Sequence, residues 1–105
     1  MLLDQQTLER LRLLRDEVRL GEGGSREYSL AGGRCGIVAE EIAVRFRWRE
    51  FYGLYRLPDG RLEEHAWNDL PDGTILDATA DQFEEGHDIR VVPSGHPEYR
   101  RYLRG

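Results

Sequence analysis

Residues 51–80 read FYGLYRLPDGRLEEHAWNDLPDGTILDATA, and this stretch decides the fold of the chain. Pro-Asp-Gly occurs twice in it, at 58–60 and at 71–73. Proline presets φ and glycine adopts positive φ without steric cost, so this tripeptide favours a tight turn. The stretch therefore predicts three consecutive antiparallel strands, at 51–57, 61–70 and 74–80.

The segments on either side complete the expected architecture. Apolar residues at helical spacing predict a helix over 4–20, with Asp4 as its candidate N-cap, and a second helix over about 35–48. A fourth strand is expected at 88–93 and a short terminal helix over 97–103. The order of elements predicts an α+β fold, in which N-terminal helices pack on an antiparallel sheet of three to four strands.

Composition narrows the classes of function. The 105 residues suffice for one compact domain over 1–105, and the net charge of −5 argues against a general nucleic-acid binder. No stretch approaches the ~18 apolar residues of a membrane helix, and the first residues are not typical of a signal peptide. We therefore expect a cytoplasmic protein without membrane contact, with a processed or delivered effector domain as the alternative.

The chain contains a single cysteine, Cys35, which excludes an intramolecular disulfide and a cysteine-based metal cluster. Neither a metal nor a cofactor is expected. Cys35 stands at the start of the predicted second helix, where unpaired N–H groups and a partial positive charge favour a thiolate over a thiol. His65 and Asp77 follow it in sequence. A thiol, an imidazole and a carboxylate are the parts of a cysteine nucleophile that is activated by an oriented base.

The turn geometry predicts whether these residues can meet. A three-residue loop at 71–73 places Trp67 opposite Asp77. Because side chains alternate along a strand, His65 then shares a face with both and is a diagonal neighbour of Asp77, within reach of a hydrogen bond. The first turn places Gly53 opposite His65, which is expected to leave the imidazole open toward an approaching helix.

Each residue of this set has an expected chemical role. Cys35 attacks a carbonyl carbon as the thiolate, and His65 takes the thiol proton and returns it to the leaving amine. Asp77 accepts a hydrogen bond from the other ring nitrogen, which fixes the tautomer and stabilises imidazolium. The backbone N–H of Cys35 is expected to be one oxyanion donor. Candidates for a second donor or for substrate contacts are Trp67, Ser29 and Gln82.

The three motifs resemble those of the transglutaminase-like and papain-like cysteine superfamily. That pattern is Gly-x-Cys opening a helix with Ala four residues on, His-Ala-Trp on a strand and Asp-x-Thr on the next strand. In this chain the motifs are Gly33-Arg34-Cys35 with Ala39, His65-Ala66-Trp67 and Asp77-Ala78-Thr79.

The match covers about residues 32–83, half of the chain. The resemblance implies Cys35, His65 and Asp77 as a catalytic triad on a papain/transglutaminase-like core. It includes small bacterial members such as lasso-peptide leader peptidases and papain-fold toxin domains that deamidate glutamine. The glutamine that supplies the papain-type oxyanion donor ahead of the cysteine has no counterpart here.

Plainer interpretations stand beside the catalytic one. Cys35 is also compatible with a small buried hydrophobe, and Trp67 with a core residue or a wall of the cleft. Rivals of Asp77 for the third role are Asp69, Asp72 and Asp81, of which Asp69 and Asp81 also have the right parity. His87 and His96 fit exposed loop positions.

Three classes of function follow. The leading one is a cysteine-dependent acyl-transfer enzyme (a peptidase, glutamine deamidase or transglutaminase) that acts on a peptide or protein substrate through a thioester. The second is a non-catalytic protein-binding module of the same fold, with a partner surface on the terminal aromatic residues or on Phe51, Tyr52 and Tyr55. The third is an effector or toxin domain.

Overall fold

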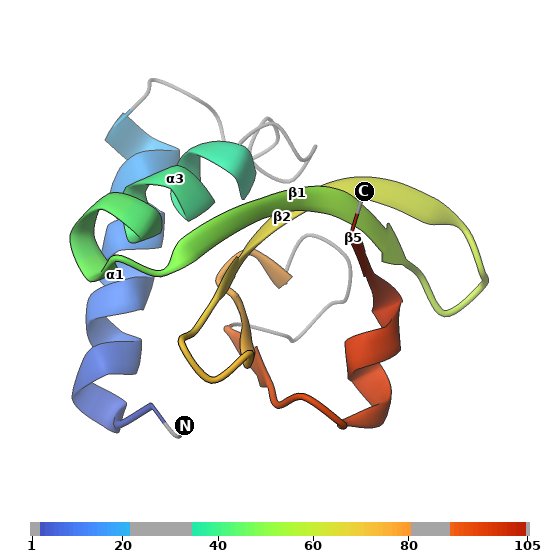
Figure 1. Cartoon of the computed structure of the whole chain (residues 1–105). Coiled ribbons are helices and arrows are strands. Elements are labelled where there is room, and N and C mark those ends of the chain that lie inside the picture. The colour runs from blue at the N-terminus through green and yellow to red at the C-terminus, as the bar shows by residue number, and fades with distance from the viewer. Residues whose placement is uncertain (1–2, 22–34, 81–88, 105) are drawn as a thin grey trace.

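The computed structural model describes residues 3–21, 35–80 and 89–104. Its elements in chain order are α1 (Gln5–Gly21), α3 (Cys35–Phe46), β1 (Arg49–Arg56), β2 (Leu62–Asp69), β3 (Ile75–Asp77), β4 (Arg90–Val92), the 3₁₀ helix η3 (Pro97–Arg101) and β5 (Tyr102–Arg104). The helices α1 and α3 lie at one side of the molecule and the C-terminal segment at the other, with the long β1–β2 hairpin arching between them (Figure 1). The predicted α+β class is confirmed.

Both predicted helices are present, and each begins close to where its sequence signal lies. The carboxylate of Asp4 accepts a hydrogen bond from the Thr7 N–H at 2.7 Å, so Asp4 caps α1 as predicted. Leu11 and Leu14 are buried against α3 and the sheet. Neither helix in the described residues is long and apolar enough to cross a membrane.

The three predicted strands form the centre of a five-stranded antiparallel sheet of order β4-β3-β2-β1-β5. Each Pro-Asp-Gly stretch closes a tight loop, since Leu57 donates its N–H to Arg61 O and Leu70 donates its N–H to Thr74 O, both at 2.8 Å. Gly60 has φ of 92° and Gly73 of 89°, which is the conformation that favours glycine at these positions. The β-meander predicted from the two turns is confirmed.

The C-terminal tail differs from the prediction. A single terminal helix was expected over 97–103, but a 3₁₀ turn at Pro97–Arg101 is followed by the fifth strand, β5, which pairs with the free edge of β1. Within the described residues the sheet therefore has five strands, where three to four were expected. Three residues are too short to display a strand period, and the pairing is with a strand some fifty residues away, so the local sequence carries no signal for it.

The two faces of the sheet bury different side chains. One face packs against the helices in a cluster that includes Val38, Ile42 and Leu76. The opposite face carries an aromatic cluster, which is formed by Tyr55, Leu57, Trp67, Ile75, Val92 and Tyr102. Strand alternation places His65 and Asp77 on the aromatic face, together with Trp67.

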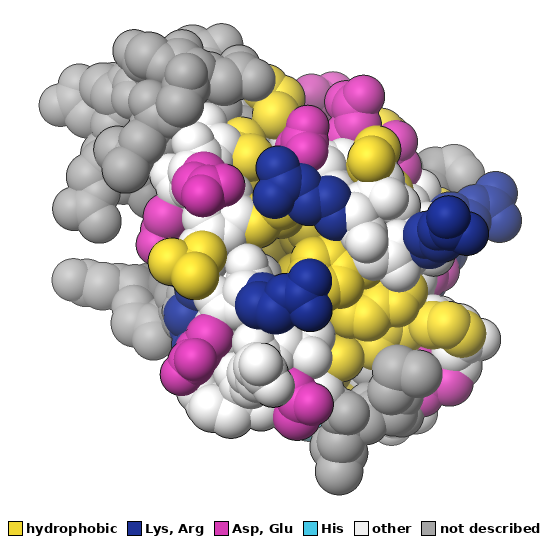
Figure 2. Space-filling model, turned by 90° about the vertical axis from the view of Figure 1, so that its left-hand side faces the viewer, with side chains coloured by type: hydrophobic (Ala, Val, Ile, Leu, Met, Phe, Trp, Pro, Cys, Tyr) yellow, Lys and Arg dark blue, Asp and Glu magenta, His cyan; other side chains and the backbone are white. Residues whose placement is uncertain are grey.

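The side of the molecule on which the helices lie has a mixed surface. Figure 2 shows arginine and acidic side chains interspersed there, with hydrophobic side chains between them. Among the described residues, Leu13 on α1 and Val44 on α3 are 65% and 72% exposed.

Arg47 is the one non-glycine residue with positive φ in the described part of the chain, at φ 60°. It directly follows α3, and its N–H still bonds to Ala43 O at 3.0 Å. Glycine is favoured at such a position because it has no Cβ to clash in the left-handed conformation.

We expect Arg47→Gly to raise the free energy of unfolding by about 0.5–1 kcal/mol, as measured by urea denaturation. Arg56→Gly, at the exposed last residue of β1, is the control and is expected to destabilise the protein. A destabilised Arg47→Gly variant would contradict the assignment of strain to this residue.

Candidate active site

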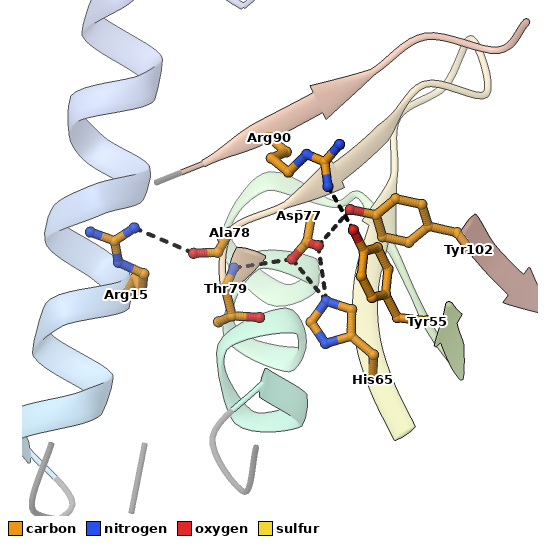
Figure 3. A network of polar contacts seen from close by, with 8 residues as sticks. All are labelled: Arg15, Tyr55, His65, Asp77, Ala78, Thr79, Arg90 and Tyr102. Carbon is orange, nitrogen blue, oxygen red and sulfur yellow. Dashed lines mark hydrogen bonds and ion pairs between the residues drawn. The ribbon is translucent and has the colours of Figure 1, made fainter. Parts of the chain in front are cut away.

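His65 and Asp77 form a buried pair between two adjacent strands. His65 lies in the middle of β2 and Asp77 ends β3, and the pairing of Asn68 with Leu76 sets the register that makes them diagonal neighbours. The imidazole Nε2 is 2.9 Å from both carboxylate oxygens of Asp77, and neither side chain is exposed to solvent. The predicted meeting of these two residues is confirmed, and Figure 3 shows them facing one another.

Asp77 is held by more than the imidazole. Its Oδ1 also accepts a hydrogen bond from the Thr79 N–H at 3.2 Å, and its Oδ2 accepts one from the Tyr102 hydroxyl at 2.6 Å. Burial by itself raises the pKa of Asp77, but the charge of His65 and the hydrogen bonds from His65, Tyr102 and Thr79 outweigh it and hold the pKa below its ordinary value. The carboxylate is therefore kept ionised in the interior.

Tyr102 remains a hydrogen-bond donor at any ordinary pH. Its burial and the negative charge of Asp77 raise the pKa of Tyr102 far above the usual value for a phenol. The Tyr102 ring packs edge-on against that of Tyr55, with centroids 5.0 Å apart. The Tyr55 hydroxyl in turn accepts a hydrogen bond from Arg90 at 2.8 Å, so β1, β4 and β5 contribute side chains around the pair on β2 and β3.

Helix α1 supports the same region from the other side of the sheet. Arg15 lies with only 7% of its surface exposed, and its guanidinium approaches the backbone oxygen of Ala78 at 3.4 Å (Figure 3). This contact ties α1 to the residue that follows Asp77.

Cys35 is the first residue of α3, as predicted. Its side chain lies outside what the structure describes. One contact places the first turn of α3 against β1, on the face of the sheet opposite to the one that carries the His65 side chain. A Cβ atom at Gly36 would lie 3.1 Å from the ring of Tyr52, and Tyr52 pairs with Ala66, the residue after His65. In Figure 3 the imidazole turns its Nε2 edge toward Asp77 and its other edge, which carries Nδ1, away from it.

Asn68 holds α3 against β2. Its side-chain amide donates to Ala39 O at 2.9 Å and to Trp48 O at 3.0 Å, and the residue is 1% exposed. Ala39 and Ala66 pack together directly between the helix and the strand. Small residues at this contact let the two backbones approach closely, so the helix that begins at Cys35 is fixed relative to the strand that carries His65.

The expected opening above Gly53 is absent. A Cβ atom at Gly53 would lie 2.3 Å from Leu103 O and 2.8 Å from Cη2 of Trp67, so β5 and an indole ring fill that space. Helix α3 packs on the opposite face, through Ala39 and Ala66. The prediction that a helix approaches His65 over Gly53 was wrong, because β5 occupies that space and no local sequence signal indicates this strand.

The other predicted site residues fall into two groups. Trp67 is 1% exposed and packs within the aromatic cluster, and its Nε1 is buried with no hydrogen-bond partner among the described residues. The structure thus places Trp67 in the core, and its role as an oxyanion donor or substrate contact stays a prediction. Ser29 and Gln82 lie outside the described residues.

The rivals of Asp77 have other partners where they are described. Asp69 is bound by the guanidinium of Arg104, and Asp72 accepts the Thr74 N–H at 3.0 Å within its own turn. Asp81 lies outside the described residues. His96 is exposed and caps η3, as its loop position suggested, while His87 lies outside the described residues.

Sequence reasoning missed Tyr102 and Asn68 as parts of this site. Tyr102 reaches Asp77 only because β5 adds to the sheet, and no spacing in the sequence indicates that pairing. Asn68 offered a weak signal, since an amide side chain on an otherwise buried strand requires a hydrogen-bond partner.

Scans of protein-family models and searches of curated proteins and of solved structures find no match to this chain.

Proposed function

We propose that the protein is a cysteine-dependent acyl-transfer enzyme that uses Cys35 as nucleophile, His65 as general base and Asp77 as the residue that orients the base. The observation that carries the proposal is the buried pair of His65 and Asp77, joined at 2.9 Å. Because Nε2 contacts the Asp77 carboxylate, the proposed proton exchange with the thiol runs through Nδ1. This division of the two ring nitrogens is what an oriented base requires.

The position of the cysteine supports the same assignment. A residue at the first position of a twelve-residue helix lies where unpaired N–H groups and the helix dipole stabilise negative charge. Both the thiolate and the oxyanion of a tetrahedral intermediate benefit from that environment, and the Cys35 N–H is the proposed oxyanion donor.

The proposed reaction has two halves. The Cys35 thiolate forms a bond to the carbonyl carbon of an amide, the carbon–nitrogen bond breaks, and His65 gives its proton to the departing amine or ammonia. The resulting thioester is then attacked by water or by an amine, whose proton His65 takes as the thiolate leaves. Water gives a carboxylate, by peptidase or deamidase chemistry, and an amine gives a new amide, by transglutaminase chemistry.

A non-catalytic binding module is the alternative function. Of the three contact residues proposed on β1, only Tyr52 is well exposed, at 60%, whereas Phe51 is half-buried and Tyr55 is 1% exposed. This exposure favours at most a small surface around Tyr52. The enzymatic proposal has the stronger support, since a buried charged pair is costly to maintain for a surface contact that does not use it.

Intact-mass measurement tests the proposal and identifies the reaction. The full chain is incubated with a panel of glutamine-containing peptides, with and without a primary amine. A gain of about one dalton indicates deamidation, a shortened product proteolysis, and an amine adduct transfer. We expect one of these products with the wild-type chain and none with Cys35→Ser. Equal product with both chains would contradict a role for the thiol, and binding of a peptide without turnover by both would favour the binding module.

A further inference from the structure

We infer that Tyr102 is a positioning residue for the His65–Asp77 pair, so that the C-terminal strand β5 is part of the candidate active site. This inference rests on the proposed function for its catalytic meaning, but its geometry is independent of it. The Tyr102 hydroxyl donates to Asp77 Oδ2 at 2.6 Å, the shortest contact that the carboxylate makes among the described residues. Tyr102 touches Asp77 and acts on His65 only through it.

The hydroxyl is placed where it can fix the carboxylate. The Thr79 N–H lies on Oδ1 and the Tyr102 O–H on Oδ2, so each oxygen has one donor besides the imidazole. A carboxylate held at both oxygens cannot rotate about its terminal bond without losing a hydrogen bond in a buried environment, where an unpaired donor costs about 1–3 kcal/mol. Both oxygens therefore stay presented to Nε2 of His65.

Strand β5 is anchored at each of its three residues. Tyr102 pairs with Tyr55, and Leu103 pairs with Leu54. The carbonyl of Leu103 lies over Gly53, where any side chain would collide with it. Arg104 binds Asp69 through both terminal nitrogens and lies over the ring of Phe51, 4.4 Å from its centroid.

These anchors connect β5 to β2, which carries His65, and to the neighbouring strand β1. Asp69 closes β2, four residues after His65, and Gly53 is the direct partner of His65 on β1. The position of the Tyr102 hydroxyl is thereby set by the same two strands that set the imidazole. The three-residue strand acts as a fixed support for Asp77 and not as a loose tail.

The hydrogen bond from Tyr102 also affects the proton equilibrium of His65. The Asp77 carboxylate accepts the hydrogen bond from Tyr102 more strongly when His65 is neutral, because an imidazolium partner partly neutralises the charge of the carboxylate. Tyr102 therefore stabilises the neutral imidazole more than the imidazolium, and its removal favours the imidazolium. The described titratable or charged groups that face the pair are Tyr55 from β1, Arg90 from β4 and Tyr102 from β5.

The test removes only the oxygen of Tyr102. In Tyr102→Phe the ring that packs against Tyr55 and Trp67 is kept. The titration of the His65 imidazole is followed by NMR on the full chain without substrate. We expect its midpoint to rise by about half a pH unit, roughly a threefold change in the protonation equilibrium.

Tyr99→Phe is the matched control. Its hydroxyl donates to Gly73 O at 2.9 Å and accepts from Arg104 at 3.1 Å, so this variant loses two tyrosine hydrogen bonds of the C-terminal segment, at a place away from Asp77. We expect no change in the His65 midpoint. A merely structural loss would lower the stability of both variants and leave the His65 titration where it is.

The outcomes separate this inference from the proposed function. The positioning role would be overturned if a folded Tyr102→Phe variant kept the wild-type His65 midpoint. It would also be overturned if Tyr99→Phe shifted the His65 midpoint as much as Tyr102→Phe does. Both results hold whether or not the protein turns over an amide. A raised midpoint in Tyr102→Phe together with no turnover by the wild-type chain would retain the positioning role and reject the enzymatic proposal.

Discussion

At pH 5 the wild-type chain is expected to react with iodoacetamide at Cys35 about thirtyfold faster than the His65→Asn variant. Thiols paired with histidine have pKa values of about 4, against about 8.5 for an ordinary thiol. At pH 5 the histidine-paired thiol is largely ionised, whereas only about one part in 3,000 of the ordinary thiol is ionised. The lower basicity of the paired thiolate reduces its nucleophilicity by about a hundredfold, which leaves a net advantage near thirtyfold.

The full pH profile distinguishes the two chains better than a single rate. Wild-type alkylation should change little between pH 5 and 7, whereas the variant should lose about tenfold for each unit that the pH falls. His96→Asn is the control, because His96 is an exposed histidine and asparagine can still cap the short helix there. Coincident profiles for the wild-type and folded His65→Asn chains would reject an ion pair between Cys35 and His65.

The second large effect concerns stability. Replacing Asp77 with alanine removes the acceptor for three buried donors, which are His65 Nε2, the Tyr102 hydroxyl and the Thr79 N–H. We expect Asp77→Ala to lower the free energy of unfolding by about 3–5 kcal/mol, since breaking a buried pair leaves its partner uncompensated. Urea denaturation at pH 7 measures this directly.

Asp59→Ala is the matched control for the same substitution at the surface. Asp59 is exposed and binds Arg61 within its own turn, so its loss should shift the unfolding midpoint far less. If the two variants lost equal stability, the buried network would not contribute as the geometry indicates.

The contribution of Asp77 to stability should also depend on pH. Its folded pKa is held below the ordinary value, so the stabilisation is complete above the unfolded pKa of about 4 and is lost as the pH falls through the folded pKa. The difference in unfolding free energy between wild type and Asp77→Asn should therefore shrink as the pH falls below about 4. A difference that grew below pH 4 would contradict the direction of the pKa change.

The hydrogen bond from Tyr102 connects the experiments on His65 with those on Asp77. It donates to the same carboxylate that orients His65, so Tyr102→Phe is expected to act on the His65 proton without removing the acceptor that stabilises the core. A comparison of Tyr102→Phe with Asp77→Asn thus separates the orientation of the base from the cost of an unpaired buried group.

Local sequence was sufficient for the part of the site that lies on the meander. Two Pro-Asp-Gly turns fixed the loop lengths, and loop length fixes register, so His65 and Asp77 could be placed on one face and within hydrogen-bonding reach. The capped start of α1 and the beginning of α3 at Cys35 were likewise predictable, because helix ends have local chemical signals.

Contacts between distant segments were decided only by the tertiary structure. The fold alone shows that Tyr102 lies against Asp77, that Leu103 covers Gly53, and that Asn68 secures α3 to β2. Pairing of β5 with β1 depends on an edge strand's unpaired backbone groups and on aromatic packing, and neither leaves a pattern in three residues. Periodicity and turns thus determined the β2–β3 pair on which the site is built, whereas long-range burial determined what surrounds that pair and holds it in place.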